Sequence, residues 1–117
     1  MLRAQSMPPG DDVTEFAASC HVNAGIVKVK MRSKRISDSA MHAWCAWMDA
    51  AYEGMTRDGQ AVRVELMDFS GNMLTAKGVS LLLNFLCRKD IRCRVLKLYR
   101  NRIERASDIS KYSPLSR

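Results

Sequence analysis

Apolar and polar positions follow the same eleven-residue pattern twice in this chain. Residues 64–74 read VELMDFSGNML and residues 93–103 read CRVLKLYRNRI. Both segments are apolar at the first, fourth, sixth and eleventh positions and carry an asparagine at the ninth. These two asparagines, Asn72 and Asn101, stand 29 residues apart. A pattern that recurs with such a period predicts a repeat architecture, in which each copy forms one structural unit.

An earlier segment, IVKVKMRSKRI at residues 26–36, fits the same pattern less completely. Its ninth position holds Lys34 in place of asparagine. A lysine side chain has no hydrogen-bond acceptor, so it cannot bridge the backbones of two neighbouring loops. This copy is therefore expected to be an imperfect terminal unit of the array. Its four apolar positions are Ile26, Val29, Met31 and Ile36.

The segments that follow the first two copies predict amphipathic helices. Residues 37–48 and 75–86 both carry apolar side chains at the i, i+3, i+4, i+7 spacing of one helix face. Ser37 and Thr75 precede them, with side-chain oxygens suited to cap a helix N-terminus. Trp47 should be half-buried against the next helix. The aligned stripes are Met41, Trp44, Cys45 and Met48 in one helix and Val79, Leu82, Leu83 and Leu86 in the other.

The first spacing between copies is 38 residues, nine longer than the second. The excess falls at residues 52–63, where Asp58-Gly59 is a turn signal, and it predicts a longer helix followed by an exposed loop. Ahead of the first copy, residues 16–22 suit either a strand or a short helix. We favour an antiparallel strand, turning at residues 23–25, because it would cover the sheet edge.

The pattern LxxLxLxxNxL resembles the leucine-rich repeat, and the 29-residue period is similar to its longer, ribonuclease-inhibitor-like class. The resemblance implies an α/β fold: a short leucine-rich-repeat solenoid with a three-stranded parallel sheet, helices on its convex face and an N-terminal capping strand. It divides the chain into a disordered lead-in at 1–12, a repeat domain at 13–110 with copies near 26–63, 64–92 and 93–110, and a tail at 111–117.

The same resemblance predicts which residues line the concave face. Positions three, five, seven and eight should face it, position ten should lie near its rim, and equivalent positions should form rows across the strands. Ser70 and Gly71 belong to these rows. Lys30, Asp68 and Lys97 should form a row that neutralises itself. The candidate partner-binding residues are Lys28, Lys30, Arg32, Arg35, Leu66, Asp68, Met73, Val95, Lys97, Tyr99, Arg100 and Arg102.

Charge is distributed in blocks that reinforce this surface. The formal charge is +7 over the 117 residues. Residues 22–35 carry +5 and residues 88–105 carry +6, whereas residues 36–87 carry −3. The first and third copies therefore form two basic flanks around a less charged centre. A basic chain of this kind suits an acidic partner, either protein or nucleic acid.

Nothing in the sequence predicts catalysis, a cofactor or a metal site. His21 and His42 have no partner pattern, and there is no phosphate loop or nucleophile motif. The four cysteines, with no CxxC pair and no zinc-type histidine spacing, are expected to be reduced packing residues of a cytoplasmic or nuclear protein. No apolar run approaches the ~20 residues of a membrane helix. The cysteines are Cys20, Cys45, Cys87 and Cys93.

The sequence favours a non-catalytic protein-interaction module that binds a protein partner or a larger complex through the concave face and the C-terminal edge strand. Two alternatives stay open: a basic RNA-associated protein, and a structural subunit of a ribonucleoprotein or other large complex. The third copy lacks a full helix, and its strand should lie at the sheet edge. Because open edges invite pairing, self-association through this edge is a further alternative.

Overall fold

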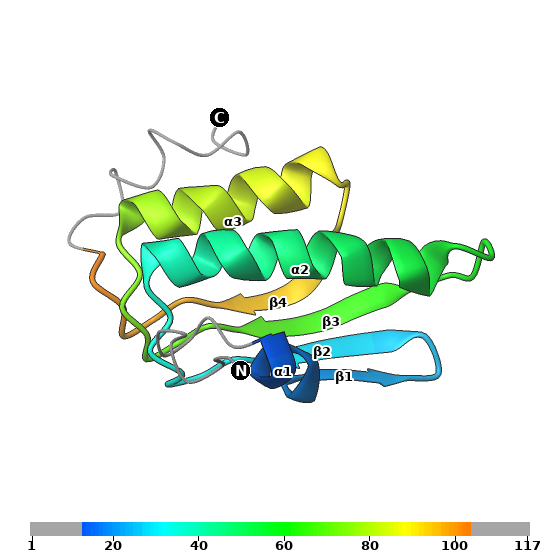
Figure 1. Ribbon diagram of the computed structural model, residues 1–117, viewed down its shortest axis with the longest axis horizontal. Coiled ribbons are helices and arrows are strands. Elements are labelled where there is room, and N and C mark those ends of the chain that lie inside the picture. Colours follow the sequence, from blue (N-terminus) through cyan, green and yellow to red (C-terminus); the bar gives the residue numbers. More distant parts are fainter. Residues whose placement is uncertain (1–12, 104–117) are drawn as a thin grey trace, which may run out of the picture.

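Four strands form one open mixed sheet in the computed structural model, which describes residues 13–103 (Figure 1). Their order is β1-β2-β3-β4; β1 is antiparallel to β2, and the other neighbours are parallel. With three helices the described chain is a small α/β domain. The strands are β1 (Cys20–Asn23), β2 (Ile26–Lys30), β3 (Arg63–Asp68) and β4 (Cys93–Lys97), and the helices are α1 (Val13–Ala18), α2 (Asp38–Thr56) and α3 (Ala76–Arg88).

The two long helices lie side by side on one face of the sheet (Figure 1). We call the opposite face, which α2 and α3 leave uncovered, the open face. Residues 16–22, for which a strand or a short helix was expected, contribute to both, because α1 precedes the favoured antiparallel strand β1. Phe16 of α1 is buried and packs on Trp47 with ring centroids 6.0 Å apart. Trp47 is half-buried as expected, but its aromatic neighbour is Phe16 of α1 and not a residue of the next helix.

Both long helices begin at the expected caps, and the two caps are joined. The hydroxyl oxygens of Ser37 and Thr75 each accept a hydrogen bond from a backbone N–H of their own first turn, at 3.2 Å. Asp38 accepts from the Thr75 backbone N–H at 2.9 Å and from its hydroxyl at 2.5 Å. Gly78 permits this approach, because a Cβ there would lie 2.1 Å from the Asp38 carboxylate.

One set of backbone hydrogen bonds occurs twice, at positions that the sequence alignment makes equivalent. Each bond joins one eleven-residue segment to the next, so the segments that match in sequence also stack in space. Between the first two segments, the N–H groups of Met31, Ser33 and Met73 donate to the carbonyls of Asp68, Ser70 and Ile36, respectively. Between the second and third segments, the N–H groups of Phe69, Gly71 and Arg102 donate to the carbonyls of Lys97, Tyr99 and Leu74. All six distances lie between 2.8 and 3.0 Å.

The two asparagines link successive loops in the same way. The Asn72 side chain donates to the carbonyls of Met31 and Phe69 at 2.9 and 2.8 Å, and its oxygen accepts from the N–H groups of Lys34 and Ile36 at 2.8 and 3.0 Å. Each of these side chains thus satisfies loop backbone groups that would otherwise be unpaired.

Asn101 repeats the arrangement one segment later. It donates to Phe69 and Leu98 at 3.0 and 2.9 Å and accepts from the Leu74 N–H at 2.9 Å. Each asparagine therefore reaches back to the segment before it. The first segment has no such segment before it among the described residues, so Lys34 needs no amide. Its ammonium instead forms an ion pair with Glu15 of α1 at 2.9 Å.

The eighth position of every segment adopts the left-handed backbone conformation, with φ of 54° at Ser33, 70° at Gly71 and 60° at Arg100. Glycine suits this conformation best because it has no Cβ. Gly71 is also constrained by its neighbour, since a Cβ there would lie 2.7 Å from the Ser33 hydroxyl. The central loop therefore requires glycine for two reasons, whereas the flanking loops accept side chains.

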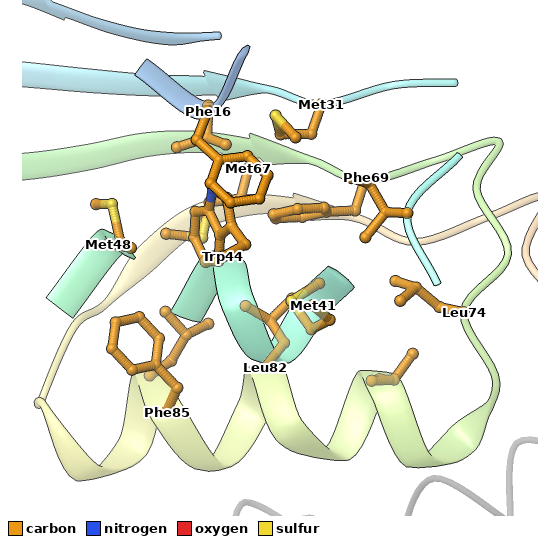
Figure 2. Packing of buried hydrophobic residues seen from close by; sticks show 14 of the residues in the cluster. Phe16, Met31, Met41, Trp44, Met48, Met67, Phe69, Leu74, Leu82 and Phe85 are labelled. Carbon is orange, nitrogen blue, oxygen red and sulfur yellow. The ribbon is translucent and has the colours of Figure 1, made fainter. Parts of the chain in front are cut away.

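The core lies between the sheet and the two long helices, and Trp44 is at its centre (Figure 2). The Trp44 ring meets Phe69 and Phe85 edge to face, with centroids 4.9 and 6.1 Å apart. The apolar positions of the third segment are only partly buried, because no described helix follows them. Those positions are Cys93, Leu96, Leu98 and Ile103.

One expected core position is wrong. The sequence pattern placed Ile26 at the first apolar position, but Val27 is fully buried there and Ile26 is half-buried. Val27 pairs with Val64 and the next residue, Lys28, pairs with Leu66, so β3 holds one residue more than β2 at this point. A β-bulge of this kind shifts which residues face the core, and the apolar pair Ile26-Val27 hides the shift in the sequence.

The nine-residue excess between the first two copies forms the expected longer helix and exposed loop. α2 continues to Thr56, and residues 57–61 are exposed. The lead-in expected at 1–12, the part of the third copy beyond residue 103, and the tail expected at 111–117 lie outside the described residues.

Replacing Asn72 with alanine should lower the free energy of unfolding by about 3 kcal/mol, because it leaves several buried backbone groups unpaired. Asn101→Ala should cost about 1–2 kcal/mol, since Asn101 is only half-buried. Urea denaturation measures both values. Gln60→Ala, at an exposed loop position, is the control and should stay within about 0.5 kcal/mol. Equal effects of the Asn72 and Gln60 changes would contradict the bridging role of Asn72.

The two simplest replacements of Trp44 should differ strongly. Trp44→Ala should lower the free energy of unfolding by about 3–5 kcal/mol, because it opens a cavity. Trp44→Phe should cost less than about 2 kcal/mol, because the buried indole N–H has no hydrogen-bond partner among the described residues. Thermal or urea unfolding compares the two. A Trp44→Phe cost as large as that of alanine would show that the indole N–H does have a stabilising partner.

Candidate interaction surface

Side chains on the open face stand in rows across the strands, as the repeat alignment predicted. Lys28, Leu66 and Val95 occupy paired positions on β2, β3 and β4. The sequence did not identify His21 as part of this row, but β1 pairs His21 with Lys28. The row therefore runs from two basic or titratable side chains to two apolar ones. The alternation of a capping strand is the signal that could have placed His21 here.

The next row contains Lys30, Asp68 and Lys97, again at paired positions. We expected these charges to neutralise one another; the register places Asp68 between the two lysines, but it forms no close ion pair with either within residues 13–103. The Asp68 carboxylate accepts hydrogen bonds from the Ser70 backbone N–H at 3.0 Å and from the Ser70 hydroxyl at 2.6 Å. The local turn after β3 thus uses this carboxylate as a hydrogen-bond acceptor.

The other six candidate residues lie in the loops that follow the strands. Met73 is half-buried, and the five others are exposed; the Tyr99 side chain is 49% exposed. The row that holds Tyr99 contains one exception, because Ser70 is buried. Its hydroxyl is turned to Asp68 and does not reach the surface. These loop residues are Arg32, Arg35, Met73, Tyr99, Arg100 and Arg102.

Several acidic side chains pair with basic residues other than Lys28, Lys30 and Lys97. Glu65 on β3 pairs with Arg94 on the neighbouring strand. Lys89, at the end of α3, pairs with Asp49 and Glu53 of α2 at 2.8 Å each, and these two carboxylates raise the pKa of its ammonium. Asp49 and Glu53 of the helical layer are thus paired with Lys89. The open face retains an unbalanced positive charge.

Strand β4 forms one edge of the described sheet. Its odd-numbered carbonyls, those of Lys97 and Tyr99 among them, accept hydrogen bonds from the β3 side. Because backbone groups alternate in direction along a strand, those of Arg94 and Leu96 point away from β3. The edge is therefore free within the described residues. It lies next to the partly buried apolar positions of the third segment.

A groove of about 290 Å³ lies between α2 and α3. Two of its lining residues, His42 and Cys45, have side chains that often take part in catalysis. Burial raises the pKa of the Cys45 thiol to about 12, although Arg88 acts in the opposite direction. The thiol is therefore protonated at neutral pH, and a protonated thiol is a poor nucleophile.

The four cysteines differ in their surroundings. Burial also raises the thiol pKa of Cys20 and Cys93, which fits packing roles. Cys87, however, is exposed, so the expectation that it packs in the interior is wrong. Cys87 lies outside the apolar stripe of α3, whose last buried residues are Phe85 and Leu86.

No group of three or more His, Cys, Asp or Glu side chains within residues 13–103 is arranged to hold a metal ion. In the same part of the chain, no helix has the length and apolar character needed to cross a membrane. No protein-family model, curated protein or solved structure matches this chain. Its function must therefore be argued from the surface described above.

Thiol reactivity should separate the exposed and buried cysteines. At pH 8, iodoacetamide should alkylate Cys87 rapidly and Cys45 only as the protein unfolds, and mass spectrometry can follow both sites. Since the folded pKa of Cys45 is raised above its ordinary value, stability should fall as pH rises from about 9 toward 12. Cys45→Ala should weaken that fall. Equal alkylation rates for the two thiols in the folded protein would contradict this assignment.

Proposed function

We propose that this chain is a non-catalytic interaction module of the leucine-rich-repeat type, and that it binds an acidic segment of a partner protein on its open face. One observation carries the proposal. The face without helices presents an apolar centre, Leu66 and Val95, beside Lys28, Lys30 and Lys97, and none of these three lysines has an ion-pair partner within residues 13–103.

Three features support the leucine-rich-repeat assignment. Asn72 and Asn101 bond to equivalent atoms of the preceding segments. The same inter-segment backbone bonds occur twice. The eighth position is left-handed in all three segments. In a solenoid of this kind the sheet strands lie parallel on one face and the helices cover the other, and the sheet face is a usual binding surface.

The chemistry of the open face favours an acidic partner with apolar side chains. Leu66 and Val95 are half-buried and adjacent on neighbouring strands, about 4.8 Å apart. The basic side chains on both sides would steer and orient a negatively charged segment. Tyr99 and Arg100, exposed on the last described loop, are of the residue types that contribute most to binding energy at interfaces.

RNA is the second candidate, and one observation favours it. Tyr99 and Arg100 are consecutive and both exposed, and an aromatic ring can stack a base while a cation contacts phosphate. Single-strand binding surfaces use several such rings in succession. Tyr99 is the only aromatic residue among the candidate surface residues, so the protein partner remains the preferred proposal.

Peptides selected from a random library for binding to this protein should be acidic and should contain apolar residues. The double variant Lys28→Glu/Lys30→Glu should lose most of that affinity, because it reverses two charges on the open face. Lys77→Glu, an exposed change on α3, is the matched control and should bind as the parent does. Isothermal calorimetry measures all three. Selected peptides without acidic enrichment, or affinity that survives the double reversal, would exclude this surface.

An RNA titration tests the second candidate directly. A random 20-nucleotide single strand should show only weak, non-saturating association at physiological salt, and its apparent affinity should fall steeply as salt is raised. Fluorescence anisotropy across a salt series measures this. Saturable binding at physiological salt that is lost in Tyr99→Ala would instead establish RNA as the ligand of the open face.

A further inference from the structure

A pocket lies at the end of the sheet where β3 and β4 begin, because the first residues of both strands line it. Its volume is about 530 Å³, within the range typical of small-molecule sites. Val62, Val64 and Cys93 provide an apolar lining, and the Tyr52 ring from α2 adds an aromatic wall. This combination of walls suits the body of a small apolar or aromatic molecule.

Part of the pocket lining comes from the stretch in which the two spacings differ. Tyr52, Val62 and Arg63 all belong to residues 52–63, the segment by which the first spacing exceeds the second. α2 continues to Thr56, so its last turns reach beyond the start of β3. The excess segment therefore has a consequence beyond loop length: it builds one side of a pocket.

The charges of the pocket are unequal. Arg63, Arg92 and Arg94 line it together with one acid, Asp90. Arg94 pairs with Glu65, and Arg92 lies 3.9 Å from Asp90 in a loose, solvent-exposed pair. Arg63 has no ion-pair partner within residues 13–103. The pocket thus combines an unpaired guanidinium, a second one only weakly held, an apolar lining and an aromatic ring.

We propose that this pocket binds a nucleoside 5′-monophosphate group. The planar guanidinium groups of Arg63 and Arg92 match the oxygens of a phosphate monoester, which they can hold in pairs of hydrogen bonds. The base packs against Tyr52 and the apolar lining, and the Asp90 carboxylate accepts a hydrogen bond from a sugar hydroxyl. This site is separate from the open face and adds a small-molecule ligand to the proposed function.

Titrations of the isotope-labelled protein with the four nucleoside 5′-monophosphates test the site by NMR. At least one should bind saturably and shift the amide signals of residues 62–64 and 92–94. Adenosine alone and inorganic phosphate alone should bind at least about tenfold more weakly, because each makes only one part of the contacts. Absence of saturation by all four nucleotides at millimolar concentration, or shifts confined to other residues, would overturn the proposal.

Variants separate this site from general attraction to a basic protein. Arg63→Ala should weaken nucleotide binding about tenfold or more, and Tyr52→Leu should weaken it while keeping the apolar packing of the wall. Arg57→Ala, an exposed change at the end of α2 that does not line the pocket, should have no effect. Equal weakening by Arg57→Ala and Arg63→Ala would reject a specific site.

The same chemistry could come from a free nucleotide or from the 5′-phosphorylated end of an RNA chain. A short RNA with and without a 5′-phosphate distinguishes the sources: tighter, Arg63-dependent binding of the phosphorylated form identifies the chain end, and no gain over the mononucleotide identifies the free nucleotide. The Lys28→Glu/Lys30→Glu variant should bind nucleotide normally, so failure of the pocket and failure of the open face are separable results.

Discussion

The side-chain amide of Asn72 is the interaction on which the rest of the structure depends. It bonds to backbone groups on both sides of the junction between the first two segments, in a setting where the side chain is only 6% exposed. A buried amide of this kind is costly unless every donor and acceptor is paired. Because the paired groups belong to two loops, the amide fixes the distance and register between them, and thereby between β2 and β3.

That register decides what the open face looks like. Once the loops are held, Lys28 must lie beside Leu66, and Lys30 beside Asp68. The helices then cover the opposite face, joined at their starts by Asp38 and by the space that Gly78 leaves. The arrangement of the open face is thus a consequence of the loops, and its character comes from the residues in which the three segments differ. Those differences set an apolar centre beside lysines that have no ion-pair partner within residues 13–103.

The sequence predicted the rows of the open face correctly, because a pattern with fixed apolar positions also fixes the strand register. It could not predict the shift from Ile26 to Val27, because both residues are apolar and a one-residue bulge leaves no other trace. The sequence also could not predict which groups bond to the Asp68 carboxylate. Strand pairing placed lysines on both sides of it, but the nearby Ser70 hydroxyl donates a hydrogen bond to it. Local side-chain geometry decided this point.

The arginine-lined pocket was beyond prediction for a different reason: it joins the end of α2 to the start of β4, which are about forty residues apart in the sequence. Only the nine-residue excess hinted that something other than the repeat was present there. Irregularities in a repeat are therefore as informative as the repeat itself, since regular positions are committed to stacking.

Native-state hydrogen exchange of the Ile36 backbone N–H tests the central claim most directly. This N–H lies in a loop, but it donates to the Asn72 side chain at 3.0 Å. If the amide of Asn72 holds the loops together, the Ile36 N–H should exchange only through global unfolding, with the same protection free energy as core strand amides such as that of Met67. Rapid exchange of Ile36 in a protein whose strands stay protected would contradict the account.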